Sequence, residues 1–543
     1  MKQIKITNPI LRGFHPDPCI CKAKDTYYLI TSTFEWLPGV SLYESKDLIN
    51  WKSKGGILQN LTLEGIPDSA GIWAPALSYD NGTFYLIYTI CKQIDGYFKD
   101  VENYVVTAKN IEGPWSEPVF VNASGFDPSM YHENGKHYVV NPQWDSRPLE
   151  GHQKFNGLVL QEFDFDKGMT GEAKVIYHGS GWGAAEGPHL IKKDEYYYLL
   201  CAEGGTGRHH SVCAARSKNI WGPYEISPYT PMITAWEQDT ILKKSGHGNL
   251  VQTDSGEWYL VHLCGRYLDK QNVCVLGRET AMQKVKWKEG WPVLETDNCV
   301  PQEQVEIKVE DADIVQQCGN RYEINWENFY KTKGKFPDEK LTKQLCKEME
   351  EQEWLSLRTK MSEKIQVKAD GLHLAGGASL TSTFSQRMVA RRLESVHSEV
   401  STVLKFWPYH YAQTAGLTCY YNTKVFYYLY VGYDEKKKQR IVNVLKNDNF
   451  VFSEPLEGRY VYVPDQTEYI FLKLRIEQEK LQFYYTFDQE KYEKIGPELD
   501  AAILSDEHVD GWAYTGTVTG ITVVDTFNKD TEAVFTYFKQ KEL

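Results

Sequence analysis

The sequence has few basic residues for its length. Its 60 Lys and Arg residues are outnumbered by 73 Asp and Glu residues, which gives a formal net charge of −13 at pH 7. Nucleic-acid affinity depends on clustered Lys and Arg side chains that displace counterions from phosphates. This charge balance argues against a nucleic-acid partner and favours a neutral small molecule.

Long apolar runs are also missing. No stretch approaches the roughly 20 apolar residues of a membrane-spanning helix. Residues 1–18 lack the apolar run of about 7–15 residues that marks a secretory signal. We therefore expect no membrane partner and a cytoplasmic location, where only ligands short enough to be imported would reach the protein.

The eleven cysteines form no recognisable framework. They are scattered from Cys19 to Cys419 without a CxxC pair, and Cys19 and Cys21 are the closest two. Disulfide frameworks use paired cysteines, and a structural zinc site needs four clustered ligands. We expect these cysteines to be small, buried, apolar thiols.

What the sequence does contain is a repeat. At 543 residues the chain is too long for a single hydrophobic core. Its first half holds one unit five times, at intervals of 53 to 61 residues: a small turn residue or Pro, an apolar pair, a polar turn and an aromatic strand. The units are DPCICKAKDTYYLITS from Asp17, APALSYDNGTFYLIYT from Ala74, DPSMYHENGKHYVVNP from Asp127, GPHLIKKDEYYYLLCA from Gly187 and GNLVQTDSGEWYLVHL from Gly248.

Each unit has the pattern of a β-hairpin. A turn such as Asp80-Asn81-Gly82 joins two short alternating strands. A single hairpin cannot bury its own apolar faces, so five in succession predict blades of about four strands around a channel. We predict a five-bladed β-propeller over residues 1–300, with a generic all-β sandwich as the alternative.

In a propeller, equivalent positions of successive blades face one channel. Three of those positions carry carboxyl groups held in tight turns, in FHPDP, GFDPS and AAEGP. One Asp-Pro turn alone is ordinary. Together they indicate glycosidic hydrolysis, which needs one protonated carboxyl group and one carboxylate. The predicted channel residues are Asp17, Trp73, Ala74, Asp127, Glu186 and His247.

Other residues could complete a sugar pocket. Arg278 could hydrogen-bond sugar hydroxyls and lower the pKa of a nearby carboxyl group, or form a surface salt bridge. Phe34, Trp73 and Trp144 could form an apolar wall, or simply belong to the core. His247 lies between two glycines and is either a hydrogen-bonded channel residue or a metal ligand.

Eight motifs in a fixed order extend this interpretation. They are GFHPDP at 13–18, TSTFEWLPGV at 31–40, GIWAP at 71–75, GFDPS at 125–129, EGPHL at 186–190, EGGTG at 203–207, GHGNLV at 246–251 and LGRETA at 276–281. With these motifs the chain resembles glycoside hydrolase family 43 over nearly its whole length. The likeness is greatest to the family's long β-xylosidases, which carry a C-terminal β-sandwich.

The resemblance implies an inverting hydrolase that releases D-xylose from the non-reducing ends of β-1,4-xylo-oligosaccharides. Asp17 would be the general base, Glu186 the general acid, and Asp127 would tune the acid and orient the substrate. Inversion requires carboxyl groups roughly 6.5–9.5 Å apart. The acid also needs a raised pKa.

The resemblance also implies roles for the remaining candidates. Arg278 would bind the first sugar, with Thr206 nearby, inside a closed pocket that allows cleavage only at chain ends. Phe34, Trp73 and Trp144 would line this pocket. No organic cofactor is implied, but a calcium ion near His247 is.

We predict a β-sandwich over residues 301–543. This range begins with an inter-domain segment at about 301–325, and half-buried strands are expected at 380–392 and 415–431. The charged stretch 336–354 is expected to be a helix or a solvated insertion.

Two segments depart from the family pattern. Val518 in YTGTVTG stands where a Phe usually closes the pocket in the family. The segment GRHH at 207–210 also differs from the family pattern, so the resemblance does not imply which sugar the outer subsite prefers.

Other functions compete with β-xylosidase activity. An α-L-arabinofuranosidase, or an enzyme with both activities, would use the same pocket, because the two sugars are similar in size and hydroxyl geometry. A non-catalytic glycan-binding propeller would have no need of Glu186. A retaining, fructosidase-like propeller is disfavoured because its NDPNG turn is absent. A homo-oligomer, either a dimer or a tetramer, is expected from the resemblance.

Overall fold

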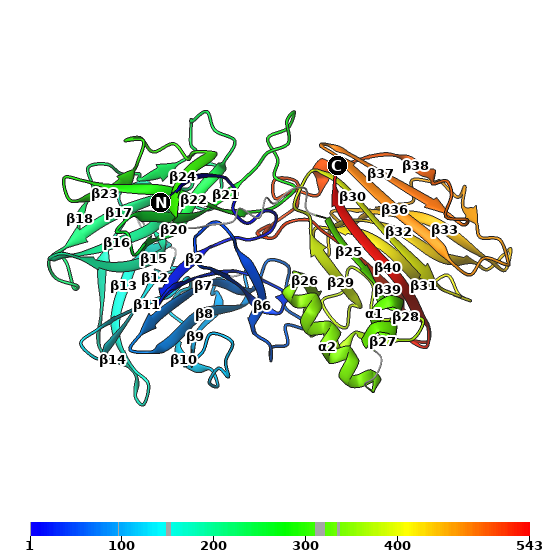
Figure 1. The fold of residues 1–543 in the computed structure, drawn as a ribbon, viewed down its shortest axis with the longest axis horizontal. Coiled ribbons are helices and arrows are strands. Elements are labelled where there is room, and N and C mark those ends of the chain that lie inside the picture. The colour runs from blue at the N-terminus through cyan, green and yellow to red at the C-terminus, as the bar shows by residue number, and fades with distance from the viewer. Residues whose placement is uncertain (1, 96, 148–153, 310–320, 334–336) are drawn as a thin grey trace.

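The five sequence repeats form the inner hairpins of five antiparallel sheets, which we call blades 1 to 5 (Figure 1). The computed structural model describes residues 2–95, 97–147, 154–309, 321–333 and 337–543. In the first hairpin of blade 2, Asn81 and Gly82 have φ angles of 47° and 78°. Asn and Gly tolerate such angles, which explains why polar turns separate the strands.

The strands of each blade follow one another in sequence. Blade 1 contains β2 (Cys19–Ala23), β3 (Thr26–Thr31), β5 (Gly39–Ser45) and β6 (Lys52–Leu58). Blade 2 contains β7 (Gly71–Asp80), β8 (Thr83–Gln93), β9 (Asp100–Ala108) and β10 (Val119–Asn122). Blade 3 contains β11 (Ser129–Glu133), β12 (Lys136–Trp144), β13 (Phe155–Asp164) and β14 (Gly168–Tyr177).

The last two blades have the same order. Blade 4 contains β15 (Glu186–Lys193), β16 (Tyr196–Glu203), β17 (Ser211–Ser217) and β18 (Glu225–Ile226), and β19 (Ile233–Thr234) also pairs with β17. Blade 5 contains β20 (Lys243–Gln252), β21 (Trp258–Gly265), β22 (Glu279–Lys288) and β23 (Trp291–Leu294).

The first strands of the blades form a closed ring. β2 contacts β7, β7 contacts β11, β11 contacts β15, β15 contacts β20, and β20 returns to β2. These strands therefore surround the central channel, and the predicted five-bladed propeller is confirmed. A separate ribbon, in which β1 (Lys2–Thr7) pairs with β24 (Gln304–Val309), joins the start of the propeller to its end.

The second half of the chain forms two stacked sheets, coloured from green through yellow to red in Figure 1. The outer sheet has the order β27 (Ile365–Lys368), β28 (Gly371–Ala375), β40 (Glu532–Glu542), β30 (His397–Lys405), β36 (Ile470–Glu477), β37 (Lys480–Thr486) and β38 (Glu493–Asp500), and β25 (Arg321–Asn325) also pairs with β40. The inner sheet has the order β34 (Val451–Ser453), β33 (Gln439–Asp448), β32 (Val425–Asp434), β31 (Gln413–Tyr420), β39 (Val518–Asp525), β29 (Met388–Arg392), β26 (Trp354–Leu357) and β4 (Trp36–Leu37), and β35 (Val461–Tyr462) pairs with β33.

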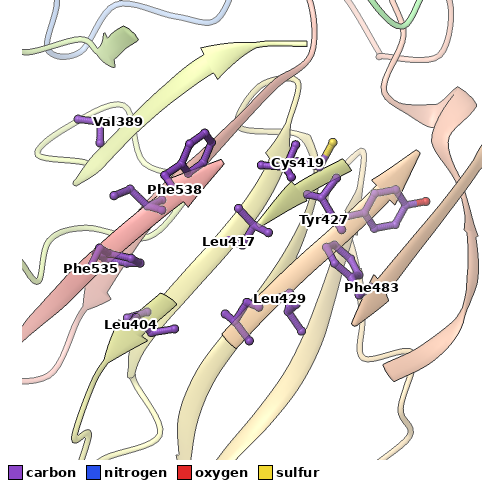
Figure 2. Close-up of a cluster of buried hydrophobic side chains, with 14 of the residues drawn as sticks. Val389, Leu404, Leu417, Cys419, Tyr427, Leu429, Phe483, Phe535 and Phe538 are labelled. Atoms are coloured by element: carbon purple, nitrogen blue, oxygen red, sulfur yellow. The ribbon is translucent and has the colours of Figure 1, made fainter. Parts of the chain in front are cut away.

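The two sheets of the sandwich share one apolar core. Figure 2 shows Leu417, Tyr427 and Leu429 of the inner sheet in a buried cluster with Phe483 and Phe535 of the outer sheet. Short 3-10 turns, η1 (Met361–Glu363) and η2 (Ala501–Ile503), place further apolar residues against this core. The predicted β-sandwich is therefore confirmed.

The central strands of the inner sheet, including β29, β31 and β39, are buried on both faces, which corrects the expectation of half-buried strands. Leu417 and Leu429 face the outer sheet, whereas Tyr420 and Tyr428 pack with Trp36 in a second cluster that includes residues of the propeller. Residues 415–431 do form the hairpin of β31 and β32, as predicted. At 380–392 only β29 is a strand. The polar residues before it, which suggested alternation, lie in turns.

The charged stretch at 336–354 is mostly the helix α2 (Asp338–Glu351), which follows α1 (Trp326–Lys333). Leu341, Leu345 and Met349 on one side of α2 belong to the sandwich core. The stretch is therefore an amphipathic helix and not a solvated insertion. Residue 336 and residues 310–320 of the predicted inter-domain segment lie outside the described residues. Neither α1 nor α2 is long and apolar enough to span a membrane, and the same holds for every described helix.

The propeller and the sandwich are joined by backbone pairing and by buried charges. β4 leaves the first blade and pairs with β26 of the inner sheet. Lys244 of blade 5 lies 2.9 Å from Asp506 and 2.6 Å from Glu507 in the sandwich. Its side chain is only 5% exposed. These charges have left water, so each depends on its partner across the interface.

We predict that Lys244→Met destabilises the protein by about 3–5 kcal/mol, because it leaves the buried carboxylate of Asp506 without its lysine partner. The measurement is the midpoint of thermal or urea unfolding. The matched control is Lys270→Met, which removes another inter-domain pair, with Glu479, whose lysine is 76% exposed. The control should cost less than about 1 kcal/mol, and equal effects would contradict the role assigned to burial.

Candidate active site

A cavity of about 260 Å³ lies where the propeller channel meets the sandwich. All nine site residues predicted from the sequence line it, which brings together positions as far apart as 17 and 278. They are Asp17, Phe34, Trp73, Asp127, Trp144, Glu186, Thr206, His247 and Arg278. The sandwich contributes Trp512 and Tyr514 to the same cavity.

The backbone holds the acids at the inner ends of three blades. Asp17 and Asp127 each lie two residues before the first strand of a blade, and Glu186 is the first residue of β15. Asp17 and Asp127 have φ angles of 53° and 48°, in the left-handed region that non-glycine residues rarely occupy. The following prolines, Pro18 and Pro128, restrict these turns further. Such backbone strain is typical of functional sites.

Asp17 is held in its charged form. Its Oδ1 accepts a hydrogen bond from Arg278 Nη1 at 3.1 Å, and its Oδ2 accepts one from Ser32 Oγ at 2.7 Å. Burial by itself raises the pKa of Asp17, but the charges of Arg278 and His247 and the Ser32 hydrogen bond outweigh it, so the pKa lies below its usual value. Asp17 is therefore a carboxylate at neutral pH.

Glu186 and Asp127 have the opposite tendency. Burial, followed by the negative charge of Asp17, raises the pKa of Glu186. Burial and the charges of Glu186 and Asp17 also raise the pKa of Asp127 well above its ordinary value. The cavity therefore contains both protonated and ionised carboxyl groups near neutral pH, as acid–base catalysis requires.

Arg278 connects the base region to the sandwich. Its Nη1 also donates to Thr206 Oγ1 at 2.9 Å, and its Nε and Nη2 donate to the backbone oxygen of Tyr514 at 3.2 and 3.0 Å. The guanidinium carbon lies 5.3 Å from the ring centroids of both Phe34 and Tyr514. Arg278 is buried and is not a surface salt-bridge residue.

Aromatic rings form one wall of the cavity. The ring centroid of Tyr514 lies 6.2 Å from that of Phe34 and 6.1 Å from that of Trp73. The Trp73 indole donates to the backbone oxygen of Ser69 at 2.9 Å, which fixes its orientation. Phe126 lies 5.4 Å from Trp73 and 6.3 Å from Trp144. The wall presents apolar ring faces of the kind that pack against sugars.

The structure corrects the expectation for Val518. This residue begins β39 and is completely buried in the cluster between the inner sheet and the propeller, away from the cavity lining. Tyr514 and Trp512 close the sandwich side instead. Tyr514 lies four residues earlier in the same YTGTVTG segment, in the loop before β39, and it lines the cavity where Val518 was expected.

Several lining residues were not predicted. Lys99, Phe126, Phe155 and Trp512 come from loops and strand ends outside the repeat pattern. His210 of the GRHH segment also lines the cavity, and its Nδ1 lies 2.9 Å from the backbone oxygen of Lys244. The departure of GRHH from the family pattern was one sequence signal among them. Phe126 lies in the GFDPS motif, where only Asp127 was singled out, whereas Lys99, Phe155 and Trp512 belong to none of the eight motifs.

His247 lies near a second histidine in the channel and outside any cluster of metal-ligating side chains in the described residues. Its ring centroid lies 6.5 Å from that of His189. Calcium prefers six to eight oxygen ligands. In the described part of the chain, no group of three or more His, Cys, Asp or Glu side chains is placed to hold a metal ion. A calcium ion at His247 therefore stays a prediction from resemblance.

Comparison with known proteins identifies the family. Residues 6–292 match the family described as glycosyl hydrolases family 43, and residues 348–541 match the β-xylosidase C-terminal concanavalin A-like domain. The chain belongs to glycosyl hydrolase family 43. It is a glycoside hydrolase, and the non-catalytic and fructosidase-like alternatives are set aside. Hydrolysis of this kind uses carboxyl groups and water and needs no organic cofactor.

Full-length relatives are found for this family 43 hydrolase. A β-xylosidase of Bacillus subtilis (strain 168) is 41% identical over 557 residues, covering 99% of this chain and 100% of the relative. The xylosidase/arabinosidase 43B of Humicola insolens is 40% identical over 549 residues, covering 98% and 97%. The crystal structure of a xylan β-1,4-xylosidase from Bacillus halodurans C-125 has a TM-score of 0.91 and 40% identity, with coverage of 99% and 100%.

We predict that Gly187→Ala lowers the hydrolytic rate of this family 43 enzyme about 100-fold. A Cβ at Gly187 would lie 2.6 Å from Cε1 of His247, so either the His247 ring or the backbone beside Glu186 would have to shift within the cavity lining. A displacement of about 1 Å costs on the order of 100-fold in rate. The measurement is the initial rate of nitrophenyl glycoside cleavage.

Gly183→Ala is the matched control. Gly183 also has a positive φ, of 85°, but a Cβ there meets nothing within 4 Å. The two variants therefore share the backbone strain and differ in the clash. Similar losses of rate in both would contradict the proposed contact between residue 187 and His247.

Proposed function

We propose that the protein is an exo-acting, inverting β-xylosidase that releases D-xylose from the non-reducing ends of short β-1,4-xylo-oligosaccharides. The observation that carries this proposal is the pair of carboxyl groups with opposite pKa shifts in one aromatic cavity, Asp17 lowered and Glu186 raised. An ionised base and a protonated acid are what single-displacement hydrolysis needs.

Each acid has a distinct role in this proposal. Glu186 donates its proton to the glycosidic oxygen as the bond to the anomeric carbon breaks. Asp17 removes a proton from a water molecule, which attacks the opposite face of that carbon. Asp127, held protonated by burial and by its acidic neighbours, orients the substrate, while burial and the charge of Asp17 keep the pKa of Glu186 high. Room for the water requires roughly 6.5–9.5 Å between the carboxyl groups of Asp17 and Glu186.

The shape of the cavity supports action at chain ends. Phe34 and Trp73 are 2% and 7% exposed, and Tyr514 of the sandwich packs against both rings. Arg278 and Thr206 supply hydrogen-bonding groups beside this wall. A pocket enclosed by two domains accepts one terminal sugar, so hydrolysis proceeds one residue at a time.

The second candidate is α-L-arabinofuranosidase activity, alone or beside the first. It is favoured by the relative named xylosidase/arabinosidase, which covers nearly the whole chain. Both substrates place a pentose in the pocket, so the same acids would serve both reactions.

Two further properties belong to the proposal. A cytoplasmic location is supported by the ten described cysteines, which are all free thiols and mostly buried, as expected in a reducing compartment. It restricts the substrate to short, imported oligosaccharides. A dimer or tetramer is proposed from the family resemblance and is measurable by light scattering.

The proposed substrate is tested by initial rates on nitrophenyl β-D-xyloside, nitrophenyl α-L-arabinofuranoside and xylobiose, with and without a chelator. We expect faster cleavage of the xyloside and of xylobiose, with inversion at the anomeric carbon seen by NMR. Dominant arabinofuranoside cleavage would replace the proposed substrate with the second candidate. A loss of rate with chelator, restored by calcium, would support the metal prediction.

The acid and base assignments predict different responses to the leaving group. Glu186→Ala should lose at least about 100-fold more rate on xylobiose than on the nitrophenyl xyloside, because an activated leaving group needs little protonation. Asp17→Ala should lose activity equally on both, because the attacking water is needed in each case. An equal loss in Glu186→Ala would remove Glu186 as the acid.

A further inference from the structure

Lys99 lies at the outer part of the cavity among three tryptophans. Its Nζ is 4.5 Å from the ring of Trp144, 4.8 Å from that of Trp512 and 5.7 Å from that of Trp73. Trp73 and Trp144 belong to the propeller, whereas Trp512 belongs to the sandwich. The ammonium group therefore attracts indole faces from both domains to one point.

The sandwich member of this group is fixed in place. The Trp512 indole donates a hydrogen bond to Oδ1 of Asp95 at 2.8 Å, and its ring lies 5.5 Å from that of Tyr514. On the propeller side, Trp144 packs against Phe155 at 5.4 Å. The indoles around Lys99 thus form an ordered surface.

This surface lies on the exposed side of the acid. Phe34 on the cavity wall is 2% exposed and Asp17 is 6% exposed, whereas Trp512 is 37% exposed. In an exo-acting hydrolase the cleaved terminal sugar occupies the enclosed part, and the leaving sugar extends toward solvent beyond the acid. Trp144, Trp512 and Lys99 are placed along that direction.

Lys99 is electrostatically linked to the acid. Its positive charge lowers the pKa of Glu186, against the stronger effects of burial and of Asp17. Burial in turn lowers the pKa of Lys99 itself. Lys99 lines the cavity, and the carboxyl groups of Asp95 and Glu186 act on it through their charges. Its ammonium can therefore donate to a ligand oxygen in the cavity.

We propose that Lys99 determines leaving-group specificity: its ammonium donates hydrogen bonds to hydroxyl oxygens of the leaving sugar, which stacks on Trp144 and Trp512. This proposal rests on the exo-hydrolase function proposed above. It assigns the outer part of the cavity to a neutral, hydroxyl-rich sugar ring. The positive charge also keeps the acid able to ionise after it has delivered its proton.

The test compares two substrates in Lys99→Met, which keeps the length and the apolar contact of the side chain but removes the charge. We expect kcat/KM on xylobiose to fall about tenfold or more, because a charge-assisted hydrogen bond to the leaving sugar is lost. On nitrophenyl β-D-xyloside, which lacks the leaving sugar, the fall should be less than about threefold.

The pH dependence of kcat/KM supplies a second readout, which would not change if Lys99 had only a structural role. Glu186 faces Asp17, Asp127, Arg278, Lys99, Tyr514 and Cys201. Only Lys99 is changed in the variant, so loss of its charge raises the pKa of Glu186. The basic limb of kcat/KM on xylobiose should move to higher pH in Lys99→Met and stay in place in Lys99→Arg.

Matched variants separate this role from general disturbance. Lys154 is exposed and lies 6.0 Å from the Trp144 ring, but it does not line the cavity. Lys154→Met should therefore leave both substrates nearly unchanged. Trp512→Leu, at an exposed loop position, should reproduce the selective loss on xylobiose and guards against misfolding of the Lys99 variant.

An equal loss on both substrates, no loss on xylobiose, or an unmoved basic limb in Lys99→Met would overturn the proposal. Failure of the proposed function is distinguishable, because it is seen in the parent enzyme. If the parent prefers arabinofuranosides, the same variants are compared on nitrophenyl α-L-arabinofuranoside and an arabinosyl disaccharide.

Discussion

The hydrogen bonds of one buried guanidinium group hold this active site together. Arg278 donates to the carboxylate of Asp17, to the hydroxyl of Thr206 and to the backbone oxygen of Tyr514. These partners belong to blade 1, blade 4 and the sandwich. A planar, permanently charged fork can satisfy all three at once, whereas a lysine could not. The ionised base, the sugar-binding face and the domain interface therefore share one residue.

The sandwich is consequently part of the catalytic unit and not an appendage. The central strands of its inner sheet are buried on both faces, and the sheet accepts β4 from the first blade as an edge strand. Buried ion pairs, Lys244 with Asp506 and Arg358 with Asp68, fix the orientation of the two domains. Because buried charges cost free energy when separated, they allow few alternative dockings. The loop bearing Trp512 and Tyr514 is therefore delivered to the cavity in a defined position.

The chemistry arises from unequal environments for similar groups. All three acids lie in one cavity, and burial alone would raise the pKa of each. Only Asp17 contacts Arg278 directly, so only its carboxyl group is held ionised. The negative charge of Asp17 then raises the pKa values of Glu186 and Asp127. Arg278, with smaller contributions from His247 and the Ser32 hydrogen bond, thus separates the base from the acids.

The sequence repeat predicts the propeller and places Asp17, Trp73, Asp127, Glu186 and His247 at one channel. The sandwich and the other four predicted pocket residues, Phe34, Trp144, Thr206 and Arg278, follow from the family resemblance. Polar turns between alternating strands specify β-hairpins locally, wherever they occur in the chain. When five such hairpins close into a ring, the residues at equivalent positions face the same channel. Tertiary structure alone decided the rest. Tyr514, Trp512 and Lys99 reach the cavity through loops whose paths depend on how the two domains pack, and no local pattern encodes that packing. For the same reason Val518 was misplaced and the inner sheet was expected to be half-buried, because its second buried face exists only against the propeller.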